Sequence, residues 1–167
     1  NLELLEVRAN PDWLVGTELE PAVQSSIKMS GQTNIFDKDL IARTRQHYEQ
    51  NPWVAQVHSI QKLFPNELVV KLELRKPIVA VEMKRTKNRA YYYLVDNQSV
   101  RLPGEYAKVP ELPLTLPVII GVIKPPPPAG HRWQDQGLND ALAVAQTLDE
   151  YQVYGKLDVA QIDVANS

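Results

Sequence analysis

The fold of this 167-residue chain is decided by the segment Leu68-Val69-Val70-Lys71-Leu72-Glu73-Leu74-Arg75-Lys76-Pro77. One side of the segment is apolar and carries Leu68, Val70, Leu72 and Leu74, and the other side is charged and carries Lys71, Glu73 and Arg75. This period of two residues is typical of a half-buried strand in an antiparallel sheet. Pro77 cannot donate a main-chain hydrogen bond, so it indicates either a sheet edge or a domain boundary. We favour a boundary that a nearly continuous strand crosses.

Four elements are predicted before this strand. Alternating residues predict a first strand over residues 2–7. Two helices follow, the first with Thr17 as its N-cap and the second with Asp37 or Asp39. The period of two then returns, but its phase slips after Val57, which indicates a bulge or burial on both faces. The predicted order is strand, helix, helix, strand, strand.

The second half of the chain predicts a sheet with one helix. Strands are expected at residues 78–83, 90–96, 100–102, 117–121 and 157–164, and the first three are expected to form a meander through the turn Asn97-Gln98-Ser99. Apolar residues recur at helical spacing from Leu138 to Leu148, which predicts an amphipathic helix over about residues 138–151. The fold class is therefore α+β. We expect a first domain over residues 1–77 and a mostly antiparallel β domain over residues 78–167, whose final strand lacks a partner because the chain is C-terminally incomplete.

Composition narrows the class of protein. Hydrophobic residues make up 44% of the chain, which is enough for a core, and no cysteine is present to form a disulfide or a thiolate metal site. The net charge of -2 is divided evenly between the halves, so the chain lacks the basic character that favours nucleic acid as a partner. No apolar run reaches the ~20 residues of a membrane span. Because the chain begins with Asn1 rather than Met, we expect an excised piece.

No residue pattern indicates an enzyme. His47, His58 and His131 stand apart, and none forms an i, i+4 pair or a metalloprotease motif with a carboxylate. No serine lies in a nucleophile motif, and phosphate-binding and dinucleotide-binding loops are absent from the sequence. The carboxylate pair Asp37 and Asp39 suits a helix N-terminus instead. We expect no catalytic residue, no cofactor and no metal.

A basic segment adjoins three tyrosines. Lys84, Arg85, Lys87 and Arg89 lie in the hexapeptide that is expected at a hairpin tip. They form either a solvated turn that discourages edge aggregation or a contact for an anionic surface, such as acidic lipid head groups, a cell-wall polymer or an acidic partner. The segment 91–93, Tyr-Tyr-Tyr, places tyrosines on both faces of one strand, as an interaction patch or as sheet packing.

Four motifs in the first half follow one another in a recognisable order. They are Gly31-Gln-Thr-Asn34-Ile35-Phe36, Asn51-Pro52-Trp53-Val54, Phe64-Pro65-Asn66-Glu67-Leu68 and Leu74-Arg75-Lys76-Pro77-Ile78-Val79-Ala80. Together they resemble the FtsQ/DivIB family of bacterial cell-division proteins, strongest over residues 31–83. The motif residues are Asn34, Phe36, Pro52, Trp53, Phe64, Pro65, Arg75 and Pro77. The segments 93–96 and 116–121 continue the resemblance, whereas Leu74 replaces a frequent Glu and the four prolines 125–128 look like an insertion.

The resemblance implies a POTRA domain of order β-α-α-β-β, followed by a β domain, in the extracytoplasmic part of a single-pass inner-membrane protein. One membrane helix would precede Asn1. The implied function is non-catalytic scaffolding at the division septum, bridging early and late division proteins, with FtsB and FtsL as expected partners and a periplasmic location. Two alternatives stay open: a POTRA-type polypeptide-binding module of an outer-membrane assembly or translocation protein, and a small wall-active enzyme.

Partner docking by strand addition to a sheet edge is a physical mechanism for such a scaffold. Val69, Lys71 and Glu73 are the candidate edge residues, because their face of the strand is polar and balanced in charge. The family's own docking strand for FtsB has no counterpart in these residues.

Overall fold

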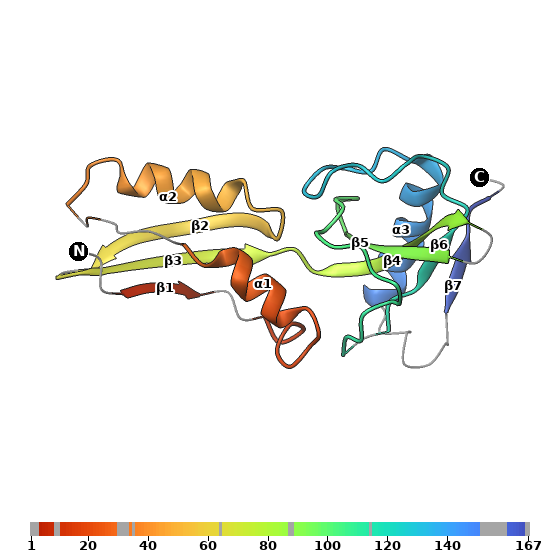
Figure 1. Ribbon diagram of the computed structural model, residues 1–167, viewed down its shortest axis with the longest axis horizontal. Coiled ribbons are helices and arrows are strands. Elements are labelled where there is room, and N and C mark those ends of the chain that lie inside the picture. Colours follow the sequence, from red (N-terminus) through yellow and green to blue (C-terminus); the bar gives the residue numbers. More distant parts are fainter. Residues whose placement is uncertain are drawn as a thin grey trace. The chain divides into compact units, whose positions relative to one another are not determined.

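The computed structural model describes residues 4–8, 11–29, 34, 36–63, 65–86, 89–113, 115–150 and 160–165. The chain divides into two compact units, Asn1–Arg75 and Lys76–Ser167, each with its own sheet (Figure 1). Helices and sheets are both present in the described residues, so the fold is α+β as predicted. The expected boundary after residue 77 lies two residues beyond this division.

The first unit follows the predicted order of elements. Its elements are β1 (Leu4–Arg8), α1 (Glu20–Ile27), α2 (Leu40–Glu49), β2 (Val54–Leu63) and β3 (Glu67–Leu74). The strand order in the sheet is β1-β3-β2, with β1 parallel and β2 antiparallel to β3. The predicted irregularity is confirmed, because the register of β2 against β3 shifts between Val57 and Ser59.

The helices of the first unit cover one face of this sheet. Leu40, Thr44 and Tyr48 of α2 are buried, and α2 packs along β2 (Figure 1). On β3 the apolar side chains are buried, whereas Lys71 and Glu73 point to solvent from the opposite face. The predicted alternation is thus confirmed from Val70 to Leu74, whereas Val69, on the same face as Lys71 and Glu73, is buried as well.

The predicted cap of the first helix is wrong, and the cap of the second lies at a predicted position but without the expected side-chain bond. Leu19 occupies the N-cap of α1 without a side-chain bond, and the Thr17 hydroxyl donates to the Leu14 carbonyl at 2.7 Å instead. Asp39 occupies the N-cap of α2 without a capping bond. The carboxylate of Asp37 accepts from the Asp39 N–H at 2.9 Å, so the two aspartates order the turn before the helix rather than the helix itself.

The second unit contains β4 (Pro77–Thr86), β5 (Arg89–Asp96), β6 (Val118–Ile120), α3 (Gln136–Glu150) and β7 (Gln161–Asp163), in the sheet order β5-β4-β6-β7. β4 and β5 form the predicted antiparallel hairpin. β6 is parallel to β4, and β7 is parallel to β6. The prediction of a mostly antiparallel sheet is therefore wrong: among the named strands only the β4–β5 pair is antiparallel, and the sheet is mixed. Parallel neighbours need a crossover connection, and α3 lies in the one between β6 and β7.

The predicted amphipathic helix is confirmed in α3. Asp135 precedes it, and its buried carboxylate accepts from the N–H groups of Leu138 at 3.0 Å and Lys124 at 3.2 Å. The apolar face of α3 joins strand residues and Trp133 in the core of this unit. Residues 151–159, including the first part of the expected strand 157–164, lie outside the described residues.

The four consecutive prolines are anchored rather than freely exposed. Pro126 and Pro127 are half-buried. The Pro127 carbonyl accepts from Arg101 Nη1 at 2.8 Å, and the Pro128 carbonyl accepts from the His131 N–H at 3.2 Å.

Within the described part of the chain, no helix has the length and apolar character that a membrane span requires.

Candidate partner-binding edge

The predicted edge residues do not lie on an edge strand. Val69, Lys71 and Glu73 belong to β3, which is paired on both sides because it lies between β1 and β2. Glu6 of β1 aligns with Val69, and Arg8 aligns with Lys71. The parallel pairing of β1 therefore closes this side of β3 at Val69 and Lys71 and excludes strand addition there, whereas Glu73 lies two residues beyond the last aligned pair.

Strand β5 lies at an edge of the second sheet, and a following segment covers most of that edge. Tyr92 and Tyr106 exchange main-chain hydrogen bonds at 2.8 and 3.0 Å. The Leu102 N–H donates to the Leu94 carbonyl at 2.8 Å, and the Asp96 N–H donates to the Val100 carbonyl at 3.1 Å. The segment 100–106 thus extends the sheet by one irregular strand.

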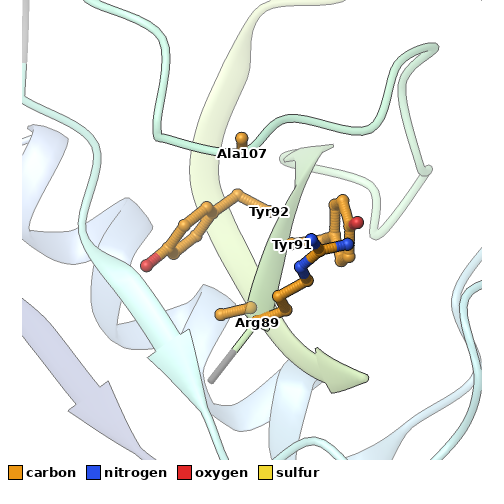
Figure 2. A pocket seen from close by; sticks show the side chains of 5 residues that line it. Arg89, Tyr91, Tyr92 and Ala107 are labelled. Atoms are coloured by element: carbon orange, nitrogen blue, oxygen red, sulfur yellow. The ribbon is translucent and has the colours of Figure 1, made fainter. Parts of the chain in front are cut away.

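This cover ends where the chain bends at Ala107, and an open pocket of about 500 Å³ begins there (Figure 2). The pocket is lined by Arg89, Ala90, Tyr91, Tyr92 and Ala107. Main-chain groups two residues apart in a strand point the same way, so the N–H and C=O of Ala90 point toward the same edge as those of Tyr92. A segment with a free N–H and C=O can bind there by main-chain pairing.

The side chains of the pocket lie on both faces of β5. Arg89 and Tyr91 point to one side of β5, and Tyr92 points to the other side (Figure 2). The Tyr92 hydroxyl donates to Glu82 at 3.2 Å. Partial burial, with a smaller contribution from the negative charge and hydrogen bond of Glu82, raises the pKa of Tyr92. Tyrosines on both faces of this strand were expected from the sequence.

The covering segment is fixed by contacts with the third tyrosine. The Tyr93 hydroxyl donates to Glu105 at 2.6 Å, and Arg101 lies 4.8 Å from the centre of the Tyr93 ring. The Arg101 guanidinium also donates to the carbonyls of Pro127 and Gly104. Burial raises the pKa of the neighbouring Tyr106, while Arg101 acts in the opposite direction. The covering segment beside the pocket is therefore held in place.

The basic segment lies at the end of the β4–β5 hairpin as predicted, but the strands extend into it, because β4 continues to Thr86 and β5 starts at Arg89. The exposed Lys84 pairs with Glu82, at 3.7 Å between Nζ and Oε1. Of the four predicted anionic-surface contacts, Arg89 lines the pocket. The side chain of Arg85 and the whole of Lys87 lie outside the described residues.

The family-like motif residues have structural roles in the first unit. The Asn34 side chain accepts from the Phe36 N–H at 3.0 Å before α2, and the Phe36 ring is 68% exposed. Trp53 is buried after Pro52, and its carbonyl accepts from the Arg75 N–H at 2.8 Å. Pro65 lies in the turn before β3, and Pro77 is the first residue of β4 in the second unit. Phe64 lies outside the described residues.

The three histidines are not brought together. His47 packs edge-on against Tyr48, His58 Nε2 lies 3.5 Å from the Glu73 carboxylate, and His131 Nδ1 lies 3.3 Å from the Ala129 carbonyl. No group of three potential metal ligands occurs in the described ranges.

Sequence reasoning missed the part of Ala90 and Ala107 in the pocket and the part of Tyr106 in the covering segment. These parts depend on main-chain direction and on the path of the chain after β5, which side-chain patterns do not encode. The turn Asn97-Gln98-Ser99 and the expected strand 100–102 predicted a returning segment, but not its continuation to Tyr106 or its bend at Ala107.

Neither a known protein-family model nor a curated protein matches this chain.

Proposed function

We propose that the chain is the extracytoplasmic, non-catalytic part of an FtsQ/DivIB-like division scaffold, with FtsB- and FtsL-like proteins as partners. The observation that carries the proposal is the first unit: its elements run strand, helix, helix, strand, strand, and its sheet order is β1-β3-β2. We read this unit as a POTRA domain. A second sheet begins immediately after it, at Pro77, as the resemblance implies.

The motif residues support this reading because they lie at joints of the unit. Asn51 follows α2, and its carboxamide accepts from the Trp53 N–H at 2.9 Å and donates to the Ser26 carbonyl at 2.8 Å. The Trp53 carbonyl in turn accepts from the Arg75 N–H. Two family-like motifs thereby tie the end of α2 to the end of β3.

Docking by strand addition suits a scaffold without catalytic groups. Main-chain hydrogen bonds supply affinity, and alternate side chains supply specificity. The second sheet presents edges at β5 and β7. At the two ends of β7 the Ala160 carbonyl and the Val164 N–H bind β6, so by the alternation of a strand the main-chain groups of Gln161 and Asp163 point to the outer side of β7.

Co-purification tests the proposal. The full-length protein, expressed with the FtsB- and FtsL-like proteins of its own genome, is expected to purify as a complex with them and to localise to the division site. A folded full-length protein that retains neither partner would overturn the proposal. The upstream coding sequence gives a second test: one apolar helix of ~20 residues before Asn1 is expected, and further POTRA copies would favour the outer-membrane assembly alternative.

A further inference from the structure

We propose that the edge of β5 at Ala90 is a docking site for an extended, acidic peptide segment of a partner protein. The segment would pair with the main chain of Ala90 and place a carboxylate beside Arg89. The inference rests on the proposed scaffold function only for the identity of the partner, because the site itself is defined by the pocket and the sheet edge.

The main chain supplies the first argument. Tyr92 uses both its N–H and its C=O to bind Tyr106, so the pair Tyr92–Glu82 is a position where β5 faces away from β4. Ala90 pairs with Lys84 two positions on and has the same direction. The covering segment bends at Ala107 before it reaches Ala90. One residue of an added strand therefore gains two main-chain hydrogen bonds there.

The pocket supplies the second argument. Its volume of about 500 Å³ lies directly at this edge, and its lining combines a flat ring with a guanidinium on one face of β5 (Figure 2). Arg89 is exposed, whereas Tyr91 is half-buried. The Tyr91 ring and the stem of Arg89 offer apolar area to a neighbouring side chain of the peptide, while the guanidinium stays available for a bidentate contact with a carboxylate.

Charge decides the chemistry of the partner. The segment 84–89 contains four cations and no carboxylate. Lys84 precedes the lining residues 89–92 by five positions, and Lys108 directly follows Ala107; their side chains are 72% and 71% exposed. Glu82 lies 3.7 Å from Lys84 and Glu111 lies 4.0 Å from Lys108, and Arg89 adds a further cation. The positive excess favours an acidic segment and disfavours a basic one.

The probe is a seven-residue peptide, acetyl-Thr-Glu-Val-Glu-Val-Glu-Thr-amide, added to the isotopically labelled chain at up to about 1 mM. We expect shifts of the amide resonances of Ala90, Tyr91 and Ala107 that saturate together. A peptide with lysine at the three glutamate positions is expected to bind at least about tenfold more weakly. A peptide N-methylated at alternate residues lacks main-chain donors but keeps the carboxylates, so its binding shows how much of the affinity comes from charge attraction alone.

Two substitutions test the two arguments separately. Ala90→Pro removes the N–H that faces the edge, and an edge strand tolerates proline at such a position. The substitution is expected to abolish saturable binding. Arg89→Glu is expected to weaken binding by roughly three- to thirtyfold. Arg132→Glu is the matched control, because Arg132 is exposed in the same unit and changes the charge equally. We expect it to bind within about twofold of the unchanged chain.

Equal binding of the acidic and lysine peptides, or unchanged binding by a correctly folded Ala90→Pro variant, would overturn the proposal. Shifts that appear only with anionic vesicles would assign the cations to a lipid surface instead, and a concentration-dependent dimer in the absence of peptide would assign the edge to a second copy of the chain. Both of these outcomes also contradict the proposal. None of these peptide-binding outcomes affects co-purification with division proteins, so the proposed scaffold function is tested separately.

Discussion

Replacing Tyr48 by phenylalanine tests how the helices of the first unit are joined. Tyr48 is fully buried, and its hydroxyl donates to the carbonyl of Ile27, the last residue of α1, at 3.1 Å. Phenylalanine keeps the ring and removes this donor. Because the carbonyl loses a partner in a buried position, we expect the free energy of unfolding to fall by about 1 to 2 kcal/mol near neutral pH.

The same substitution has the opposite effect in alkali. Burial raises the pKa of Tyr48 from 10.0 to about 12. Between these values the unfolded chain loses the proton and the folded chain keeps it, so the unfolded state binds fewer protons and stability falls as the pH rises. Two pH units correspond to about 2 to 3 kcal/mol. The phenylalanine ring of the variant cannot ionise, and the deficit of Tyr48→Phe is therefore expected to vanish or reverse as the pH approaches the raised pKa.

Urea unfolding followed by tryptophan fluorescence measures this, with the buried Trp53 as the reporter of the first unit. Thr44→Val is the matched control on the same helix, since the buried Thr44 hydroxyl has no hydrogen-bond partner among the described residues. It is expected to raise the free energy of unfolding by about 1 kcal/mol at every pH. If Tyr48→Phe and the unchanged chain lose stability in parallel from neutral pH into alkali, the reasoning from burial is refuted.

Two further substitutions test the second unit. Asp135→Ala is expected to cost about 2 kcal/mol of unfolding free energy, because the N–H groups of Leu138 and Lys124 lose their acceptor. Asp135→Asn should recover part of the loss in the same urea experiment, and a larger loss for Asn than for Ala would contradict the capping role. Gly121→Ala is expected to cost more than about 1 kcal/mol and to reduce amide protection in β7, because Gly121 has φ +87 and a Cβ would lie 2.5 Å from the Ala165 nitrogen. Unchanged protection of β7 would show that this close approach relaxes freely.

Local sequence patterns predicted the helices and strands, but they did not predict which distant strands pair. The alternation around Val70 and the helical spacing from Leu138 depend on neighbours in sequence, and both predictions are confirmed. The parallel pairing of β1 with β3 joins residues far apart in the sequence, such as Leu4 and Glu67, and no side-chain pattern specifies it. The placement of Val69 on an edge was wrong for this reason.

The candidate site was predictable only where side chains mark it. Arg89 and the neighbouring tyrosines were singled out by charge and aromatic content. Ala90 was not, because its contribution is the direction of its main chain, and that direction follows from the register of Tyr92 with Tyr106. The expected cap Thr17 failed on a similar ground, since its hydroxyl found the closer Leu14 carbonyl.

The way β5 is covered gives the open position at Ala90 its significance. An uncovered edge strand pairs with other chains without discrimination, so proteins cover or interrupt their edges. Here the segment 100–106 protects β5 from Asp96 to Tyr92, and Arg101 and Tyr93 hold that segment with a cation–π contact and hydrogen bonds to main-chain and side-chain acceptors. The covering segment ends opposite Tyr92, one position short of Ala90 on the same edge of β5 and next to the basic end of the hairpin. A short open edge bordered by cations limits both the length and the charge of what can pair there, which is the selectivity that a docking site needs and that a long bare edge lacks.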